Sequence, residues 1–164
     1  DVREVIFDGR IVRLVVLDGK WEVVEHADAV GVLVARGRQV LGVRQPRVAI
    51  GRDSWEVPAG LVDPDEDPLR AAAREMAEEA QLGGRFELIA RFYTSPGFTD
   101  EETYLYELHE AAPVDGTPEA DEELTLEWRD ALEAWEAIKD GRLATSSVTA
   151  VALRHVLARE GVAP

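Results

Sequence analysis

The chain contains no cysteine, so it can form neither a disulfide nor a metal site built on thiolates. Lysine and arginine number 18 against 33 acidic residues, which leaves a formal net charge of −15 at pH 7. This charge argues against nucleic acid as a partner, because phosphate backbones attract clustered positive charge. No apolar run approaches the roughly 20 residues that cross a bilayer. Residues 1–7 also lack the apolar core of a signal peptide, so we expect a cytoplasmic protein with no membrane partner.

The sequence does contain enough apolar material for one folded domain, since 46% of its 164 residues are hydrophobic. In the first half, the turn dipeptides Asp8-Gly9 and Asp18-Gly19 predict a small three-stranded antiparallel sheet at the N-terminus. The expected strands are 2–7, 11–17, 21–24, 29–35, 39–45, 55–57, 86–93, 103–108 and 124–128. Two helices are expected near the C-terminus, over 130–139 and 146–159. A mixed sheet with helices on both faces, an α/β sandwich, is the fold that this pattern indicates.

Three carboxylates gather in one short stretch of the sequence. Glu75, Glu78 and Glu79 are spaced three and four apart, so a helix would place them on one face. Like charges repel there unless a cation lies among them, and a hard divalent cation takes oxygen ligands. For this short pattern alone, a merely solvated helix face is the more common explanation.

The helix that carries these glutamates has clear start signals. Asp67 can cap its N-terminus, and Pro68 suits the first helical position. Its apolar stripe, which should face the core, comprises Leu69, Ala72, Ala73, Met76 and Ala80.

A longer pattern around this helix resembles the Nudix hydrolase signature, a family with an α/β/α sandwich fold. The matching positions are Gly60, Glu66, Arg74, Glu75, Met76, Glu78, Glu79 and Leu82. The one departure is Gln81, where the family usually has glycine. That glycine would serve the helix exit, where a positive φ is convenient, and we expect Gly83 and Gly84 to serve it slightly later.

Further blocks resemble the ADP-ribose pyrophosphatase branch of this family, and they extend the resemblance over nearly the whole chain. The blocks are residues 8–13, 22–27, 43–47, 55–61 and 95–101. The resemblance implies metal-dependent hydrolysis of the pyrophosphate bond of ADP-ribose to AMP and ribose 5-phosphate. It implies Mg²⁺, or Mn²⁺ in its place, held mainly by Glu75 and Glu79 with help from Glu78 and the Ala59 carbonyl. Arg74 would orient one of the signature carboxylates.

The same resemblance assigns a general base and the substrate contacts. The base would be a glutamate of the acidic loop 119–123, with Glu122 favoured and Glu123 or Glu119 as alternatives; loop-surface acids with no such role are the competing interpretation. Glu66 would steady the signature loop. The expected substrate-binding residues are Arg47 at the phosphates, Glu56 at the adenosine end, and Ser95, Gly97 and Glu101 at the terminal ribose.

Similar proteins exchange their N-terminal sheet between two subunits, so we expect a homodimer. Residues 1–26 would form the dimerisation strands and contribute to the substrate site, with Arg10 and Arg13 as candidate adenine contacts, and residues 27–164 would form the hydrolase domain. The remaining polar and aromatic candidates are expected to be structural, the tryptophans in the core or a dimer interface; they are His26, His109, His155, Trp128 and Trp135.

Two alternative functions stay open at this point. The chain could hydrolyse another nucleoside diphosphate derivative, such as a nucleotide sugar or a dinucleotide, or it could be a sensor that binds ADP-ribose without cleaving it. Sensors commonly lose metal-ligand carboxylates, so the retention of all three glutamates favours an enzyme.

Overall fold

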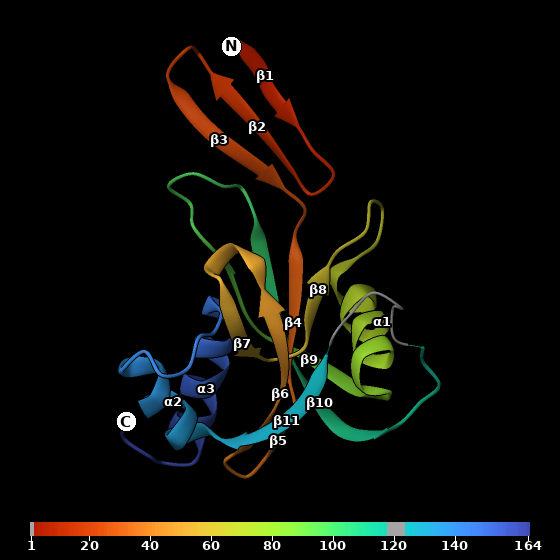
Figure 1. The fold of residues 1–164 in the computed structure, drawn as a ribbon. Helices are drawn as coiled ribbons and strands as arrows, with labels where there is room; N and C mark the ends of the chain where they lie inside the picture. The colour runs from red at the N-terminus through yellow and green to blue at the C-terminus, as the bar shows by residue number, and fades with distance from the viewer. Residues whose placement is uncertain (1, 118–123) are drawn as a thin grey trace.

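The computed structural model describes residues 2–117 and 124–164 of the chain, and Figure 1 shows its fold. Its strands are β1 (Arg3–Asp8), β2 (Val12–Leu17), β3 (Trp21–His26), β4 (Ala29–Leu33), β5 (Ala35–Arg36), β6 (Gln39–Arg47), β7 (Arg52–Glu56), β8 (Ala59–Leu61), β9 (Leu82–Tyr93), β10 (Glu102–Pro113) and β11 (Thr125–Asp130). Its helices are α1 (Pro68–Ala80), α2 (Ala131–Lys139) and α3 (Ser147–Arg159), and a short 3-10 helix, η1 (Val48–Ile50), joins β6 to β7.

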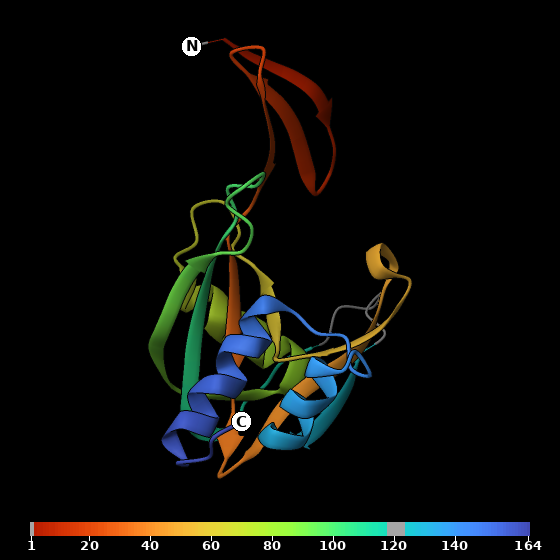
Figure 2. The same cartoon turned by 90° about the vertical axis from the view of Figure 1, so that its left-hand side faces the viewer.

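The first three strands form an antiparallel sheet of their own, in the order β1-β2-β3, which confirms the predicted N-terminal sheet. Asp18 and Gly19 turn the chain between β2 and β3 with φ angles of 52° and 65°, the conformation that Asp-Gly hairpin turns adopt. This sheet stands away from the rest of the molecule and continues into it through β3 and β4 (Figure 2). Its position leaves the apolar side chains of Phe7, Ile11 and Trp21 exposed.

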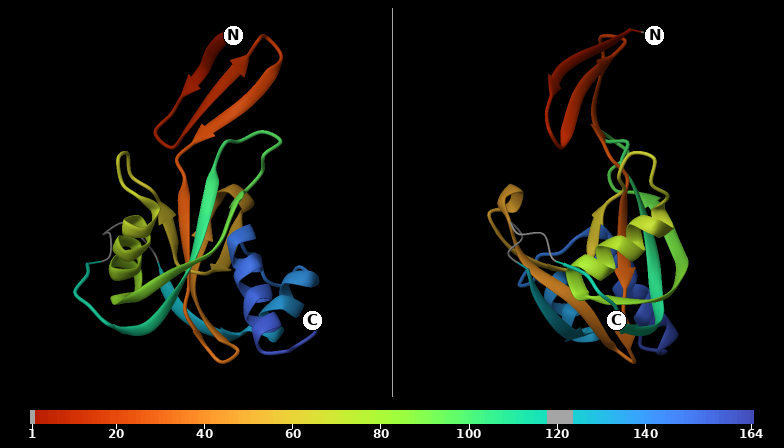
Figure 3. Two further views of the ribbon diagram at one scale, coloured as in Figure 1. Left: turned by 180° about the vertical axis from the view of Figure 1, so that it is seen from behind. Right: turned by 90° about the vertical axis from the view of Figure 1, so that its right-hand side faces the viewer.

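The remaining strands form two sheets, ordered β8-β4-β10-β9 and β11-β6-β5, and β7 pairs with β6. β10 runs parallel to β4, whereas its pairing with β9 and the pairings of β6 are antiparallel. Helix α1 covers one side of these sheets, and α2 and α3 cover the other (Figure 3). The predicted α/β sandwich with a mixed sheet is therefore confirmed.

Two apolar clusters fill the space between the layers, and β4 and β10 contribute to both. Leu33 and Leu105 belong to the cluster that α2 and α3 cover, whereas their neighbours Val32 and Tyr106 belong to the cluster beneath α1. Successive strand residues point to opposite faces, so a strand buried on both faces must be apolar at every position. Trp135 packs against the first cluster, as expected. Trp128 is 36% exposed and so does not lie in the core. Of its two predicted locations, the dimer interface remains.

Several element predictions need correction. β8 was not predicted, because three residues of the type Ala-Gly-Leu carry little strand signal of their own. On α1, Leu69 and Ala73 are exposed and Ala71 is buried beside Met76, so the buried face of the helix is rotated from the expected stripe. No helix within residues 2–117 and 124–164 has the length and apolar character required to span a membrane.

Candidate active site

Helix α1 begins where local signals predict. The Asp67 side chain accepts a hydrogen bond from the Arg70 N–H at 3.0 Å, and Pro68 is the first helical residue. The C-terminus differs from the prediction. Gln81 itself adopts the left-handed conformation with a φ of 52°, and its Nε2 donates to the Glu78 carbonyl at 2.8 Å.

The expectation that Gly83 and Gly84 would replace the missing signature glycine is therefore wrong, because both residues already lie in β9. The positive φ costs backbone energy at a residue other than glycine, and Gln81 adopts it at the position where the family signature has glycine.

Arg74 ties the signature loop to the helix. Its Nε and Nη2 donate to the two oxygens of Glu66, each at 2.9 Å, and its Nη1 donates to Glu75 Oε1 at 2.7 Å. Nη2 also donates to the Leu61 carbonyl at 3.0 Å. Glu78 Oε2 lies 3.6 Å from Nη1. One planar guanidinium thus positions both the loop and the first glutamate of the cluster, which the point charge of a lysine could not do.

The charges of this network persist over a wide pH range. Hydrogen bonds from Arg74, and then from the backbone N–H of Asp63 at 3.0 Å, lower the pKa of Glu66 to about 2. The hydrogen bond to Glu66 also raises the pKa of Arg74, although burial opposes the change. Both partners are therefore ionised at neutral pH, and the loop is fixed before any ligand arrives.

Gly60 allows the Glu75 carboxylate to lie directly against the backbone of β8. β8 pairs antiparallel with β4, and Gly60 is opposite Val30. A Cβ atom at residue 60 would fall 2.5 Å from Glu75 Cγ and closer still to the carboxyl group. No side chain fits there while Glu75 keeps this position, so the close approach of Glu75 requires glycine. Ala59, whose carbonyl is a predicted metal ligand, is the adjacent residue.

A cavity of about 910 Å³ opens beside these residues. Among the described residues it is lined by six carboxylates and two guanidinium groups, those of Glu56, Asp63, Glu75, Glu78, Glu79 and Glu101 and of Arg47 and Arg74. This many like charges repel unless cations lie among them. The donor set consists of oxygen atoms only, which fits Mg²⁺ or Mn²⁺.

Arg47 is fixed at the cavity wall by a buried carboxylate. Its Nε and Nη2 donate to the two oxygens of Glu56, each at 2.9 Å, and the Ser54 hydroxyl donates a short hydrogen bond to Glu56 Oε2. Burial opposes the ionisation of Glu56, but the hydrogen bonds from Arg47 and Ser54 outweigh it and hold its pKa below the ordinary value. Arg47 and Glu56 therefore line the cavity as a charged pair.

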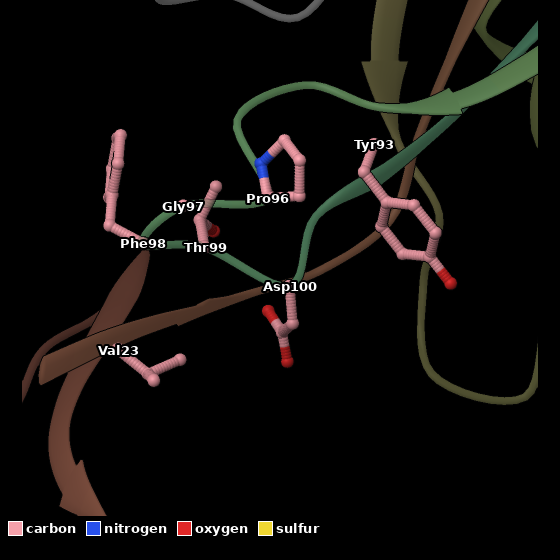
Figure 4. A pocket seen from close by; sticks show the side chains of 7 residues that line it. All are labelled: Val23, Tyr93, Pro96, Gly97, Phe98, Thr99 and Asp100. Carbon is pink, nitrogen blue, oxygen red and sulfur yellow. The ribbon is translucent and has the colours of Figure 1, made fainter. Parts of the chain in front are cut away.

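The loop between β9 and β10 separates the predicted ribose contacts. Glu101 lines the large cavity, but Ser95 does not, and Gly97 lines a smaller hollow of about 320 Å³ (Figure 4). The loop folds back onto β3, where Val24 N–H donates to the Phe98 carbonyl at 2.7 Å. The structure therefore does not bring Ser95 and Gly97 together with the other predicted residues.

His26 was predicted to be structural, yet it lines the large cavity with its Nδ1 3.0 Å from Glu101 Oε2. Thr103 and residues 146–148, at the start of α3, also line it without having been predicted. No sequence signal connects these positions, because they come from three separate parts of the chain that only the fold brings together.

A second group of possible metal ligands lies outside the cavity, on the β9–β10 ladder. The ligand atoms of Glu87, Glu107 and His109 lie within 4.8 Å of one another. Arg159 Nη1 donates to both oxygens of the buried Glu107, at 2.8 and 2.7 Å, and His109 Nε2 lies 3.0 Å from Glu87 Oε1. These charges are paired with one another, which agrees with the structural role predicted for His109.

The predicted general bases, Glu122 and Glu123, and their alternative Glu119 lie outside the described residues. The residues on either side contact other elements of the fold. Gly116 lies so close to the Ala77 carbonyl of α1 that a Cβ atom would overlap it. On the other side, Thr125 pairs with Arg44 of β6. The chain on either side of 118–123 is thus bound to α1 and to β6.

Comparison with known proteins agrees with this geometry. The family model described as NUDIX domain matches residues 25–151. An ADP-ribose pyrophosphatase of Bacillus subtilis (strain 168) is 32% identical in an alignment that covers 98% of this chain and 92% of that protein. A methanol dehydrogenase activator of Bacillus methanolicus is also 32% identical, over 97% of this chain and 92% of its own length. The crystal structure of an ADP compounds hydrolase shares the fold, with a TM-score of 0.75 and 16% identity over 99% of this chain and 95% of that one.

Proposed function

The chain belongs to the Nudix hydrolase family, and from that premise we propose that it hydrolyses the pyrophosphate bond of ADP-ribose to AMP and ribose 5-phosphate. Water forms a new bond to one phosphorus atom, the bridging P–O bond breaks, and the proton of the water passes to a base. The observation that carries the proposal is the convergence of the acidic cluster of α1 with Arg47 in one cavity. Its volume of about 910 Å³ lies within the range of roughly 300–1,000 Å³ that is usual for small-molecule sites.

Mg²⁺, or Mn²⁺ in its place, would be held by Glu75 and Glu79 as the main ligands, with Glu78 and the Ala59 carbonyl as further ligands. The close approach of Glu75 to Gly60 supports this assignment, because it brings a carboxylate beside the backbone of β8. A bound divalent cation supplies charge neutralisation at the phosphoryl oxygens and activation of water. The protein's contribution is to fix the carboxylates before the cation arrives.

Arg74 serves this purpose without touching substrate, since its guanidinium is occupied by Glu66, Glu75 and the Leu61 carbonyl. Arg47 is the phosphate contact, as a planar donor suited to phosphate oxygens. Both oxygens of Glu56 accept hydrogen bonds from Arg47, so we assign Glu56 to holding Arg47 in place at the adenosine side.

At the other end of the substrate, Glu101 accepts hydrogen bonds from the hydroxyl groups of the terminal ribose. Its position in the cavity supports this role, whereas Ser95 and Gly97 line no part of the cavity in this conformation. We therefore retain Glu101 as the primary ribose contact.

We propose Glu122 as the general base, with Glu123 or Glu119 as the alternatives. The support comes from the residues on either side: Gly116 lies against the Ala77 carbonyl of α1, and Thr125 pairs with Arg44 of β6. Both α1 and β6 contribute residues to the cavity. A glutamine substitution at each position separates the three candidates, because only replacement of the base should reduce turnover by orders of magnitude.

We also propose a homodimer in which residues 1–26 of one protomer pack on residues 27–164 of the other. In the described chain, the strand partners of β1, β2 and β3 are one another, with β3 also joined to the β9–β10 loop at Val24. A three-stranded sheet with exposed Phe7, Ile11 and Trp21 buries little apolar surface of its own. Size-exclusion chromatography with light scattering tests this. A species of twice the 18.1 kDa chain mass is expected, and a stable monomer would contradict it.

The substrate proposal is tested by product analysis of the purified protein with Mg²⁺ and a panel of ADP-ribose, ADP-glucose, GDP-mannose, NADH, diadenosine polyphosphates and FAD. We expect AMP and ribose 5-phosphate from ADP-ribose at the highest kcat/KM. Preferential cleavage of another compound would replace the substrate and keep the metal site. Binding of ADP-ribose without cleavage would make the chain a sensor.

A further inference from the structure

His26 joins the N-terminal sheet to the cavity. It is the last residue of β3, and its backbone N–H donates to Asp100 Oδ1 at 2.9 Å. Its Nδ1 lies 3.0 Å from Glu101 Oε2 and 2.6 Å from the Ala27 carbonyl oxygen. Both of these atoms are acceptors, so Nδ1 carries a proton in the neutral and in the charged ring alike. The environment thus selects one tautomer of His26, whose Nδ1–H donates to the Ala27 carbonyl oxygen while Glu101 Oε2 lies within ion-pair distance of the same nitrogen.

The carboxylate of Glu101 is held at both of its oxygens. Oε2 lies 3.0 Å from His26 Nδ1, and Oε1 accepts a long hydrogen bond from Thr103 Oγ1 at 3.4 Å. The side chain is 22% exposed and lines the cavity. A carboxylate offers about four acceptor positions, so one polar contact on each oxygen leaves capacity for two hydrogen bonds more. Two neighbouring hydroxyl groups of a ribose would match that capacity.

We infer that His26 is a positioning residue that orients the Glu101 carboxylate for the terminal ribose of the substrate. This inference rests on the proposed function, because it assigns the ribose end of ADP-ribose to Glu101. A long glutamate side chain otherwise loses rotamer freedom when the ligand binds, and this loss weakens binding. The close contact with His26 Nδ1 restricts the carboxylate in advance.

The test compares three substitutions at one position. His26→Asn keeps an amide N–H close to the position of Nδ1, whereas His26→Gln places it near Nε2 and His26→Ala removes it. We expect KM for ADP-ribose to rise about tenfold in His26→Ala and His26→Gln, the usual effect of losing a polar contact to a charged group, with kcat changed much less. His26→Asn should recover most of the affinity. His155→Asn, a histidine substitution outside the cavity, is the matched control and should leave KM unchanged.

Product inhibition distinguishes positioning from general loss of structure. In His26→Ala and His26→Gln, the Ki of ribose 5-phosphate should rise while the Ki of AMP stays at the wild-type value. An equal rise of both constants would overturn the inference, because it would indicate a displaced loop, and so would wild-type constants in all variants. If His26→Ala fails to fold, the contrast between the asparagine and glutamine variants decides the question in the same way. Absence of ADP-ribose hydrolysis in the wild type would overturn the proposed function together with this inference.

Discussion

Replacing Gly60 with alanine should abolish most catalysis while leaving the fold almost unchanged. The new Cβ would lie 2.5 Å from Glu75 Cγ and closer to the carboxyl group. Carbon atoms in ordinary contact are about 3.5–4.0 Å apart, so the end of the Glu75 side chain must retreat by roughly 1 Å or more. The retreating group is the tip of a flexible side chain, so we expect the free energy of unfolding to change by no more than about 1 kcal/mol.

The expected catalytic loss is much larger than the loss of stability. A displacement of about 1 Å in a positioned group costs roughly 100-fold in rate, and Glu75 is also the residue that Arg74 holds. We therefore expect kcat/KM for ADP-ribose to fall about 100-fold in Gly60→Ala. The assay is product formation with saturating Mg²⁺, measured beside urea unfolding of the same preparation.

Gly37→Ala is the matched control. Gly37 has a φ of 58° with no atom within 4 Å of the new Cβ, and it lies outside the cavity. Alanine there should cost about 1–2 kcal/mol of stability through the left-handed backbone and leave kcat/KM intact. A Gly60→Ala enzyme with more than half of the wild-type activity would refute the reasoning about Glu75.

Three further substitutions test the network around α1. Glu79→Gln should reduce turnover by orders of magnitude with a wild-type thermal melting curve, because it removes a metal-ligand charge from a cluster that needs a cation; near-normal turnover would contradict the assignment. Glu66→Gln should lower stability at pH 7. Since Glu66 has a pKa of about 2 in the folded chain against about 4.3 unfolded, its stabilisation is complete above pH ~4.3 and is lost as the pH falls towards 2, so urea unfolding of the variant should depend less on pH in that window. Gln81→Gly should raise the free energy of unfolding by about 0.5 kcal/mol, the relief of a positive φ less the lost hydrogen bond to Glu78, and unchanged or lower stability would refute that account.

The elements that could be predicted from the sequence are those whose cause is local. The cap of α1 depends on Asp67 and Pro68, which are adjacent, and the Asp18-Gly19 turn is a property of two residues. β8 escaped prediction because its conformation comes from pairing with β4, about thirty positions earlier, and Ala-Gly-Leu has no strand preference of its own.

The site shows the same division between local and distant causes. The metal-ligand candidates of α1 follow from helical spacing, and the structure places Glu75, Glu78 and Glu79 in one cavity. His26 could not be predicted because its partner Glu101 lies 75 positions away and meets it only after the β9–β10 loop folds back onto β3. The same folding carries Gly97 into a separate hollow, which sequence order could not reveal.

The most direct test of the proposed reaction follows ADP-ribose by phosphorus NMR in the presence of the purified protein, first with EDTA and then with excess Mg²⁺. The account predicts that the pyrophosphate signals persist in EDTA and are replaced, after Mg²⁺ is added, by two phosphomonoester signals at the positions of AMP and ribose 5-phosphate. Pyrophosphate signals that shift or broaden on binding but never disappear, with Mg²⁺ and with Mn²⁺, would contradict it.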